Sequence, residues 1–366
     1  MDIATYNQME VLAKARLSSW RFQQIFSPVL FEHVGFPARI EHIGQVRGLL
    51  AGMHRLARIR LTVGELGGLQ EDDLPVIAGA LGSYLRWYRT WFSDESVPIP
   101  LGDLMAQFMS FARLSGIPER SRVLEIGPGY GLTSLFASGD PLIQTYDTIE
   151  ITQSLYIMQS SLGRHCFGPG FRDAALPAEN WAGVGALGGP DSSVQAHRPG
   201  GLKTRREFRS TLYPWWEIDA PLSQRYDVVV SNSNLAEMSE GALLYYLENW
   251  KKVLSDDGYV LVQDLGRVEH IQEEAVLRHL DRQGYRALVK FAGEHGGKRF
   301  SMWNLLLVAE RHPAYARARS VLEPSVFLTD DETVRRVYRL DRPAGRTMSA
   351  SDIFRDAVTR LGEPME

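Results

Sequence analysis

Three glycines at alternate positions are the first feature of this sequence that could carry chemistry. In the stretch VLEIGPGYG, an apolar run breaks into the glycines Gly127, Gly129 and Gly131. An apolar run that stops in glycine predicts a buried strand, a tight turn and a helix that opens near Leu132. Such a turn presents backbone N–H groups and the positive end of a helix to a ligand, and glycine lets the ligand approach the main chain.

Two classes of ligand compete for a turn of this kind. Dinucleotide sites require the spacing G-x-G-x-x-G/A, but the third position counted from Gly127 is Leu132. The spacing here is E-x-G-x-G-x-G, and it begins at Glu125. A carboxylate beside the turn would repel a diphosphate, whereas it suits a ligand with a cationic amino group. S-adenosylmethionine, which carries an α-amino group and a sulfonium, meets this requirement.

Acidic residues also follow the second apolar run. The stretch TYDTIEITQSLY places Asp147 and Glu150 at 20 and 23 residues after Gly127. A nucleotide ribose needs a carboxylate near this position, because its two hydroxyls donate hydrogen bonds. We take Glu150, at the end of the apolar stretch, as the candidate and keep Asp147 in reserve.

The core that must position these residues runs from Arg122 to about Arg311, where short apolar strands alternate with helices. This pattern predicts an α/β fold with a mostly parallel sheet covered on both faces. The last two strands follow each other directly, which predicts an antiparallel hairpin at one edge. The expected strands are Val123–Ile126, Gln144–Ile149, Arg209–Leu212, Asp227–Ser231, Tyr259–Asp264, Tyr285–Phe291 and Trp303–Ala309.

Three further segments accompany this core, which we expect to span residues 118–311. Residues 1–117 are predicted to be helical and to form a cap, or a region for substrate binding or dimerisation. Residues 163–207 interrupt the core with a glycine-rich insertion that is too long for a plain connection, so we expect it to be mobile or to form a lid. Residues 312–366 form a polar extension with a predicted helix near Ser351–Leu361.

The helical region carries an aromatic stripe in the stretch SYLRWYRTWF. Its side chains recur at spacings of three, four, seven and eight, which is typical of one face of an amphipathic helix. They are Tyr84, Trp87, Tyr88, Trp91 and Phe92. The stripe would pack on the core or wall a substrate pocket. Exposed aromatic helices would also be compatible with a homodimer.

Composition and charge limit the kinds of partner that this protein can have. The 366 residues carry a net charge of -4, so we expect neither nucleic acid nor a membrane as partner, but a small-molecule acceptor. The basic run HRPGGLKTRREFR is typical of a solvated loop. No apolar run approaches the roughly 18 residues of a membrane span, and no signal peptide is evident, so we expect a cytoplasmic protein. The single cysteine, Cys166, excludes an intramolecular disulfide and a zinc site of several thiolates.

With these motifs the sequence resembles the class I S-adenosylmethionine-dependent methyltransferases, whose first motif reads like VLEIGPGYG. A second region agrees, since Asp227 opens the fourth strand and Gly258 starts the fifth strand after a helix. The resemblance spans about residues 120–310. It implies a Rossmann-like seven-stranded methyltransferase sheet and S-adenosyl-L-methionine as the cofactor.

The resemblance also implies roles for individual residues. Glu125 would contact the methionine portion of the cofactor through the turn, often via water, and the three glycines would make room for it. The side chains of TLYPWW, chiefly Tyr213 and Trp215, would stack on the adenine or pack in the core. The remaining residues implied at the cofactor are Glu150, Ser231 and Asn232.

A narrower resemblance concerns the acceptor. The stretches YDTIEITQSLYIMQSSL and SNSNLAEMSEGALLYYLENWKKVL look like the bacterial sugar O-methyltransferases, in which an SN...EM segment follows the fourth strand. This resemblance implies O-methylation of a sugar or a related hydroxylated metabolite. N- or carboxyl-methylation of a natural-product intermediate is the nearest alternative, because the cofactor half would look the same. A methyltransferase-like binding module without catalysis is disfavoured by the intact glycine turn.

A hydroxyl acceptor must be held in line and needs a base. Glu237 in NSNLAEM is the first candidate, because the segment after the fourth strand lies beside the transferred methyl in this fold. Asp264 and His270 in QDLGRVEH, and His295 in GEHGG, are the others. Asp264 could instead ligate a divalent cation with Glu237 or Glu269, but nothing in the spacing requires a metal and we expect none.

Overall fold

A ten-stranded sheet lies at the centre of the molecule. The structure is a computed structural model that describes residues 1–17, 38–52, 56–92, 96–176, 209–266, 270–295 and 298–362. The strands are β1 (Arg122–Ile126), β2 (Thr145–Glu150), β3 (Phe171–Asp173), β4 (Ser210–Pro214), β5 (Tyr226–Asn232), β6 (Leu254–Gln263), β7 (Arg286–His295), β8 (Lys298–Val308), β9 (Arg319–Ser320) and β10 (Val326–Phe327).

The strand order confirms the predicted fold class. The sheet runs β10-β7-β8-β6-β5-β1-β2-β4-β3, with β9 paired to β7. Strands β1 to β6 are mutually parallel, while β8 lies antiparallel between β6 and β7. All seven predicted strands are present, and the last two form the expected antiparallel hairpin. The chain therefore has a mixed α/β, Rossmann-like sheet with an antiparallel hairpin.

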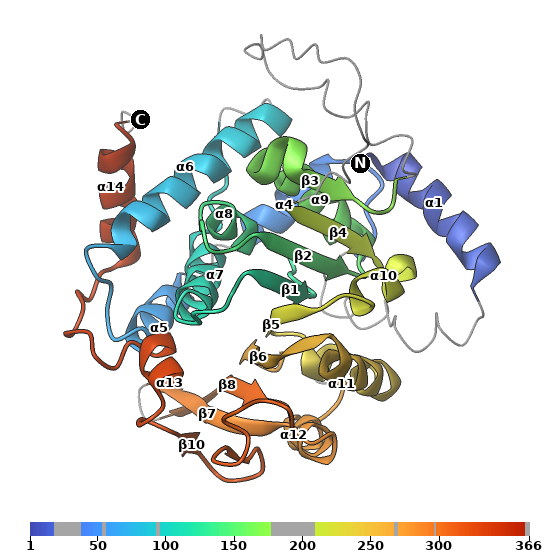
Figure 1. Ribbon diagram of the computed structural model, residues 1–366. Coiled ribbons are helices and arrows are strands. Elements are labelled where there is room, and N and C mark those ends of the chain that lie inside the picture. Colours follow the sequence, from blue (N-terminus) through green and yellow to red (C-terminus); the bar gives the residue numbers. More distant parts are fainter. Residues whose placement is uncertain are drawn as a thin grey trace, which may run out of the picture.

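Helices cover both faces of this sheet (Figure 1). Alternate side chains of β1 enter opposite cores, with Val123 in one apolar cluster and Leu124 in the other, as the period of two of a strand requires. Within the described ranges no helix has the length and hydropathy of a membrane span. The first face is covered by α6 (Asp73–Trp91), α7 (Leu101–Leu114), α8 (Thr133–Ala137) and α9 (Gln153–Phe167), and the second by α10 (Asp219–Leu222), α11 (Glu240–Val253) and α12 (Glu273–Arg282).

The described part of the region before β1 is helical, as predicted. Besides α6 and α7 it contains α1 (Ile3–Arg16), α4 (Gly44–Gly52) and α5 (Ala57–Glu65). The aromatic stripe lies on α6 and packs within the chain: Tyr84, Trp87 and Tyr88 are buried, and the Trp87 indole N–H donates to Ser161 Oγ of α9 at 3.0 Å. These three side chains cannot supply the exposed aromatic face on which the homodimer expectation depended.

The predicted insertion begins inside regular structure. Residues 163–173 complete α9, form a short 3-10 turn and enter the sheet as β3, which pairs with β4. The sequence did not predict this three-residue strand, because the glycines of GPGF directly before it indicate a loop. Residues 177–208 lie outside the described residues, and with them most of the segment expected to be mobile or a lid.

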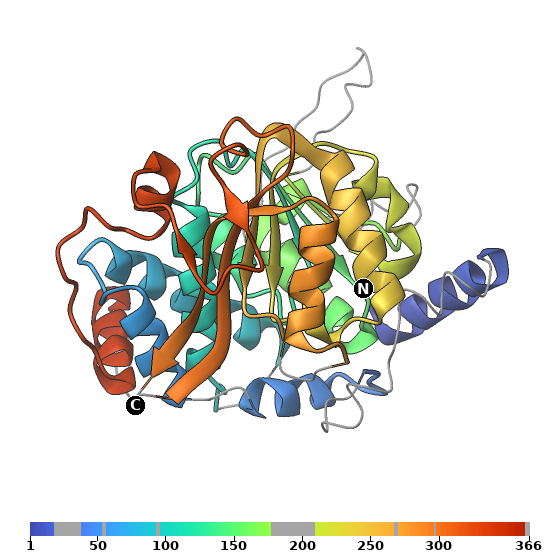
Figure 2. The same ribbon diagram turned by 90° about the horizontal axis from the view of Figure 1, so that it is seen from below.

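The extension that follows the sheet folds back on the N-terminal helices. It contains α13 (Glu332–Val337) and α14 (Ala350–Leu361), the second of which confirms the predicted helix. Figures 1 and 2 show α14 alongside α6. The two helices approach so closely that a Cβ at Gly82 would lie 2.6 Å from the Leu361 Cδ2. Helix α13 approaches the residues that follow α7 equally closely, since a Cβ at Gly116 would lie 2.5 Å from the Val337 Cα.

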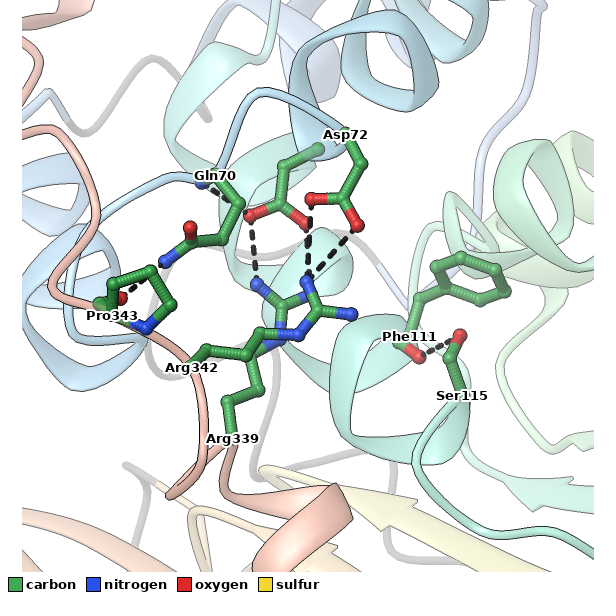
Figure 3. Close-up of polar contacts among 8 residues, drawn as sticks. Gln70, Asp72, Phe111, Ser115, Arg339, Arg342 and Pro343 are labelled. Carbon is green, nitrogen blue, oxygen red and sulfur yellow. Dashed lines mark hydrogen bonds and ion pairs between the residues drawn. The ribbon is translucent and has the colours of Figure 1, made fainter.

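A buried ion pair fixes this extension (Figure 3). The Arg339 guanidinium binds both oxygens of Asp73 at 2.7 and 2.9 Å, and the same carboxylate accepts from the Gln70 backbone N–H at 2.9 Å. The neighbouring Arg342–Asp72 pair, at 3.1 Å, is far more exposed: its side chains are 43% and 67% accessible, against 11% and 5% for Arg339 and Asp73.

We expect Arg339→Met to lower the free energy of unfolding by about 3–5 kcal/mol, because Asp73 would keep a buried charge without its partner. Arg342→Met is the matched control, and its exposed pair should contribute about 1 kcal/mol or less. Chemical denaturation measures both values. Equal losses in the two variants would contradict the stabilising role of the buried pair.

Candidate active site

The glycine turn lies at the point where the order of the strands across the sheet reverses. β1 pairs on one side with β2, which follows it in the chain, and on the other side with β5, which comes later. In open α/β sheets this switch point, at the carboxyl ends of the strands, is where ligands bind. The turn is tied to the neighbouring strand by the Gly127 N–H, which donates to the Ile149 carbonyl at 2.9 Å.

All three glycines adopt left-handed backbone conformations, with φ near +59°, +59° and +69°, which side chains rarely tolerate. Their surroundings differ. A Cβ at Gly127 would lie 2.5 Å from Asn234 Nδ2, and one at Gly131 would lie 2.8 Å from Gln159 Cγ, whereas at Gly129 no described heavy atom lies within 4 Å. The turn is therefore closed by protein at its two ends and open at its centre.

Glu125 lies beneath the turn rather than at its surface. Its side chain is 0% exposed. It accepts hydrogen bonds from the Tyr146 hydroxyl of β2, from Asn232 Nδ2 of β5 at 2.8 Å and from Thr133 Oγ1 of α8 at 3.5 Å. Burial raises the pKa of Glu125 to about 7, against the opposing effect of these three donors. The side chain thus holds two strand ends and the helix start in place.

Glu150 ends β2 and is also buried. One of its oxygens accepts from the Thr152 N–H at 2.8 Å, and the other accepts from Gln159 Nε2 at 2.9 Å. The same Gln159 amide group donates to the carbonyl oxygen of Gly129. Gln159 therefore links the acid of β2 to the glycine turn. Burial raises the pKa of Glu150 to about 7.

Gln159 retains one unused acceptor. Its Oε1 atom is buried and has no hydrogen-bond partner among the described residues, and the whole residue is 5% exposed. A buried polar atom without a partner costs free energy unless something supplies one. An acceptor of this kind beside a carboxylate and an open glycine turn suits a ligand that brings hydroxyl donors, as a ribose does. The residues present fit a nucleoside cofactor.

Three other residues expected at the cofactor lie in the core. Asp147 is three residues from the end of β2, on the face opposite Glu125, where it accepts from Tyr226 and from the Thr211 N–H, both at 2.9 Å. Its distance from the edge is about 10 Å, at roughly 3.3 Å per residue. Tyr213 and Trp215 are buried at 3% and 1% exposure. The structure does not bring Asp147 to the glycine turn. Tyr213 and Trp215 pack in an apolar cluster, and their stacking on an adenine stays a prediction.

The end of β5 adjoins the turn. Ser231 donates to Asn234 Oδ1, and the Asn234 amide donates in turn to the Ile126 carbonyl, the last of β1. Asn232 donates to Glu125. The expected residues of this segment therefore lie next to the glycine turn, although they bond to the protein itself.

The candidate bases lie on two segments, one after β5 and one after β6, and backbone hydrogen bonds join these segments. The Ala236 N–H donates to the Leu265 carbonyl at 2.6 Å, and the His270 N–H donates to the Ala236 carbonyl at 2.8 Å. Glu237 is half-buried, with its Cγ close to Gly266, and its N–H donates to the Asn234 carbonyl at 3.1 Å. Glu237 is thus connected to the turn through Asn234.

The other candidates lie farther along the same edge. Asp264 is buried and accepts from the Ser233 hydroxyl at 3.2 Å, while His270 is exposed. Asp264 and Ser233 both have positive φ, at +66° and +54°, and such strain clusters at functional sites. His295 lies at the tip of the β7–β8 hairpin, and its side chain lies outside the described residues.

Glu269, named above as a metal ligand together with Asp264, is outside the described residues as well. In the described part of the chain no group of three or more His, Cys, Asp or Glu side chains could hold a metal ion.

The sequence did not predict Gln159 or Asn234 as residues of this site. Gln159 interrupts the buried face of α9, between Tyr156 and Leu162, and this polar residue at an apolar position is a signal that could have found it. Asn234 had no comparable signal, because its role depends on the contact between the ends of two strands.

No protein-family model matches the chain, and no curated protein matches it. Solved structures do resemble it. The glycopeptide N-methyltransferase MtfA complexed with S-adenosyl-L-methionine shares 18% identity over 55% of this chain and 93% of MtfA, with a TM-score of 0.32. The DhpI–SAH complex shares 16% identity over 64% of this chain and 98% of DhpI, with a TM-score of 0.36.

Magnesium protoporphyrin IX methyltransferase from Synechocystis PCC 6803 with bound SAM shares 13% identity over 66% of this chain and 100% of its own, with a TM-score of 0.35. Such values assign neither a substrate nor site residues. The strand order and the glycine turn give the chain the mixed α/β, Rossmann-like sheet that its resemblance to the class I S-adenosylmethionine-dependent methyltransferases implies.

We expect the burial of Glu125 to make stability depend on pH. Its pKa is raised from 4.5 to about 7 in the folded protein, so the folded state binds more protons and stability falls as pH rises between these values. Relative to Glu125→Gln, the wild-type protein should lose about 3 kcal/mol over this window, at about 1.4 kcal/mol per pKa unit. Urea denaturation at several pH values measures the difference.

The control for this series is Glu248→Gln, which alters an exposed carboxylate of α11 and should keep the wild-type slope from pH 4.5 to pH 7. A Glu125→Gln variant with the wild-type slope would show that Glu125 is ionised in the folded protein across the whole range.

Proposed function

We propose that the chain is an S-adenosylmethionine-dependent methyltransferase that O-methylates a small molecule, a sugar or a related hydroxylated metabolite. One observation carries the cofactor half of this proposal. The left-handed glycine turn is open only at Gly129, and it is joined through Gln159 to the buried acid Glu150. The acceptor half is supported by the resemblance of the sequence to sugar O-methyltransferases.

In this proposal the residues of the chain bind the cofactor and orient it. Glu150 and Gln159 would hold the ribose hydroxyls, and the turn around Gly129 would receive the amino-acid end through its backbone N–H groups. Glu125 acts as a positioning residue, because it is enclosed by its own donors and fixes the strand ends around the turn. When bound, S-adenosylmethionine supplies an electrophilic methyl group on a sulfonium.

The acceptor would approach from the segments that follow β5 and β6. Glu237 would accept the proton of the acceptor hydroxyl, since its segment is bonded to Asn234 at the glycine turn. Asp264 and His270 remain the alternatives, one strand farther from the turn. Orientation of the two reactants is the larger contribution to rate, and a positioned base adds about 10²–10⁴-fold.

A first test separates ligand binding from folding. Gly129→Ala should lower the affinity for S-adenosylhomocysteine at least about tenfold, because the new methyl group enters the open space of the turn, while the left-handed conformation costs about 1–2 kcal/mol of stability. Gly362→Ala is the matched control, since Gly362 is also left-handed and has open surroundings but ends α14, away from the glycine turn. Calorimetric titration and thermal unfolding give both quantities.

A wild-type protein that ignores S-adenosylhomocysteine and S-adenosylmethionine, or that binds a nicotinamide dinucleotide at the turn, would overturn the proposed function. Binding without turnover on any acceptor would favour the non-catalytic module instead.

A second test concerns the base. With an acceptor found by screening free sugars, nucleotide sugars, phenols, amines and carboxylates for methyl transfer by mass spectrometry, Glu237→Gln should lower kcat about 10²–10⁴-fold and leave the affinity for S-adenosylhomocysteine unchanged. Glu240→Gln, an exposed carboxylate three residues on, should retain wild-type kcat. Unchanged turnover in Glu237→Gln would contradict the role of Glu237 as the base, and methylation of amines or carboxylates only would contradict methylation of a hydroxyl group.

A further inference from the structure

Helix α1 lies against the segments that follow β2 and β4. Gln153, in the first turn of α9, donates to Asn7 Oδ1 at 2.6 Å and accepts from the Ile40 N–H at 2.8 Å. On the other side, Trp215 donates to Glu10 Oε1 at 3.3 Å. The helix is therefore held to the sheet by polar contacts at two of its turns, on the side of the carboxyl ends of β2 and β4.

Tyr6 lies between these two anchors. Its ring contacts Tyr156 of α9, with centroids 5.2 Å apart, and meets Trp216 edge-on at 5.1 Å. The residue is 0% exposed. Its hydroxyl is buried and has no hydrogen-bond partner in the part of the chain that the structure describes. Tyrosine hydroxyls normally find a partner when they are buried, so this one requires an explanation.

The hydroxyl lies in the electrostatic field of two acids. Burial, and then the charges of Glu10 and Glu150, raise the pKa of Tyr6 well above its ordinary value. The side chain is consequently a neutral donor at all physiological pH values. Tyr156, which the Tyr6 ring contacts, lies one helical turn after Thr152 and one turn before Gln159, the two residues that donate to Glu150. Tyr6 and Glu150 therefore lie against the same face of the α9 region. Gln159 Oε1 on this face is also buried and has no partner among the described residues.

The three groups complement one kind of ligand. Glu150 and Gln159 Oε1 accept hydrogen bonds, whereas the Tyr6 hydroxyl donates one. A vicinal diol has two O–H donors and two oxygen acceptors, so it can donate to the first pair and accept from the third. A purely apolar ligand would leave Gln159 Oε1 and the Tyr6 hydroxyl without partners. A diphosphate would be repelled by the Glu150 carboxylate.

We propose that Tyr6 of helix α1 donates a hydrogen bond to a ribose hydroxyl of the bound cofactor and so makes α1 part of the cofactor site. This inference rests on the proposed function, because the diol is that of the adenosyl group. It assigns to the N-terminal helix a direct role in holding the cofactor, with Tyr6 as donor and Gln159 as acceptor around Glu150. Binding then fixes α1 against α9.

The test uses the full chain and the variants Tyr6→Phe and Tyr156→Phe. Removing the Tyr6 hydroxyl breaks no bond within the described structure, so the ligand-free variant should unfold at the wild-type denaturant midpoint or above it. Its affinity for S-adenosylhomocysteine should fall about three- to tenfold, the effect of one hydrogen bond. Tyr156→Phe should do the opposite, since its hydroxyl donates to Asp173 at 2.6 Å: it should lower the midpoint and retain the affinity.

Two analogues locate the contact. The affinity difference between wild type and Tyr6→Phe should vanish for either the 2′-deoxy or the 3′-deoxy form of S-adenosylhomocysteine and persist for the other. Hydrogen exchange of the α1 amides should slow when S-adenosylhomocysteine binds to the wild-type protein.

The outcomes separate the two proposals. If the wild-type protein binds S-adenosylhomocysteine but Tyr6→Phe binds it equally well, or if the difference persists for both analogues, the role of Tyr6 is overturned and the proposed function stands. A water molecule on the Tyr6 hydroxyl would give this result. If the wild-type protein binds none of these ligands, both proposals fail.

Discussion

The burial of one carboxyl group, Glu125, is the constraint on which the arrangement of the site depends. A fully enclosed acid is costly unless its oxygens are hydrogen-bonded, and the donors come from three elements: Tyr146 of β2, Asn232 of β5 and Thr133 of α8. These elements surround the glycine turn. Satisfying Glu125 therefore fixes the relative positions of the strand ends that a ligand at the turn would meet.

The polar layer extends from Glu125 into the helical region. Ser110 of α7 lies 2.9 Å from both Asn232 Oδ1 and Gln263 Oε1, and the Gln263 amide donates to the Ala106 carbonyl at 3.2 Å. Helix α7 thus completes hydrogen bonds that the ends of β5 and β6 would otherwise lack. The helices that precede the sheet are part of the framework of the site, because buried polar groups of the sheet depend on them.

The sequence predicted the sheet well, because alternating apolar strands and helices with a terminal hairpin leave few ways to pair. It also predicted the glycine turn after β1 and the acid that ends β2, since both positions follow from strand ends. It failed where the face of a strand decides the outcome: Asp147 and Glu150 are three residues apart, so they point to opposite faces. It could not predict that Gln159 bonds to Glu150 or that Tyr6 packs on Tyr156, since these contacts come from the packing of α9 and α1.

The pairing of Asp73 with Arg339 spans 266 residues of sequence, and this separation has a consequence for synthesis. At about 5–20 residues per second, the guanidinium emerges from the ribosome roughly 13–53 s after the carboxylate. During that interval Gly68, Gly82 and Gly116 have none of the close neighbours from the extension that their missing side chains accommodate. The helices that precede the sheet therefore stay incompletely packed, and accessible to chaperones, until the residues around Arg339 have been synthesised.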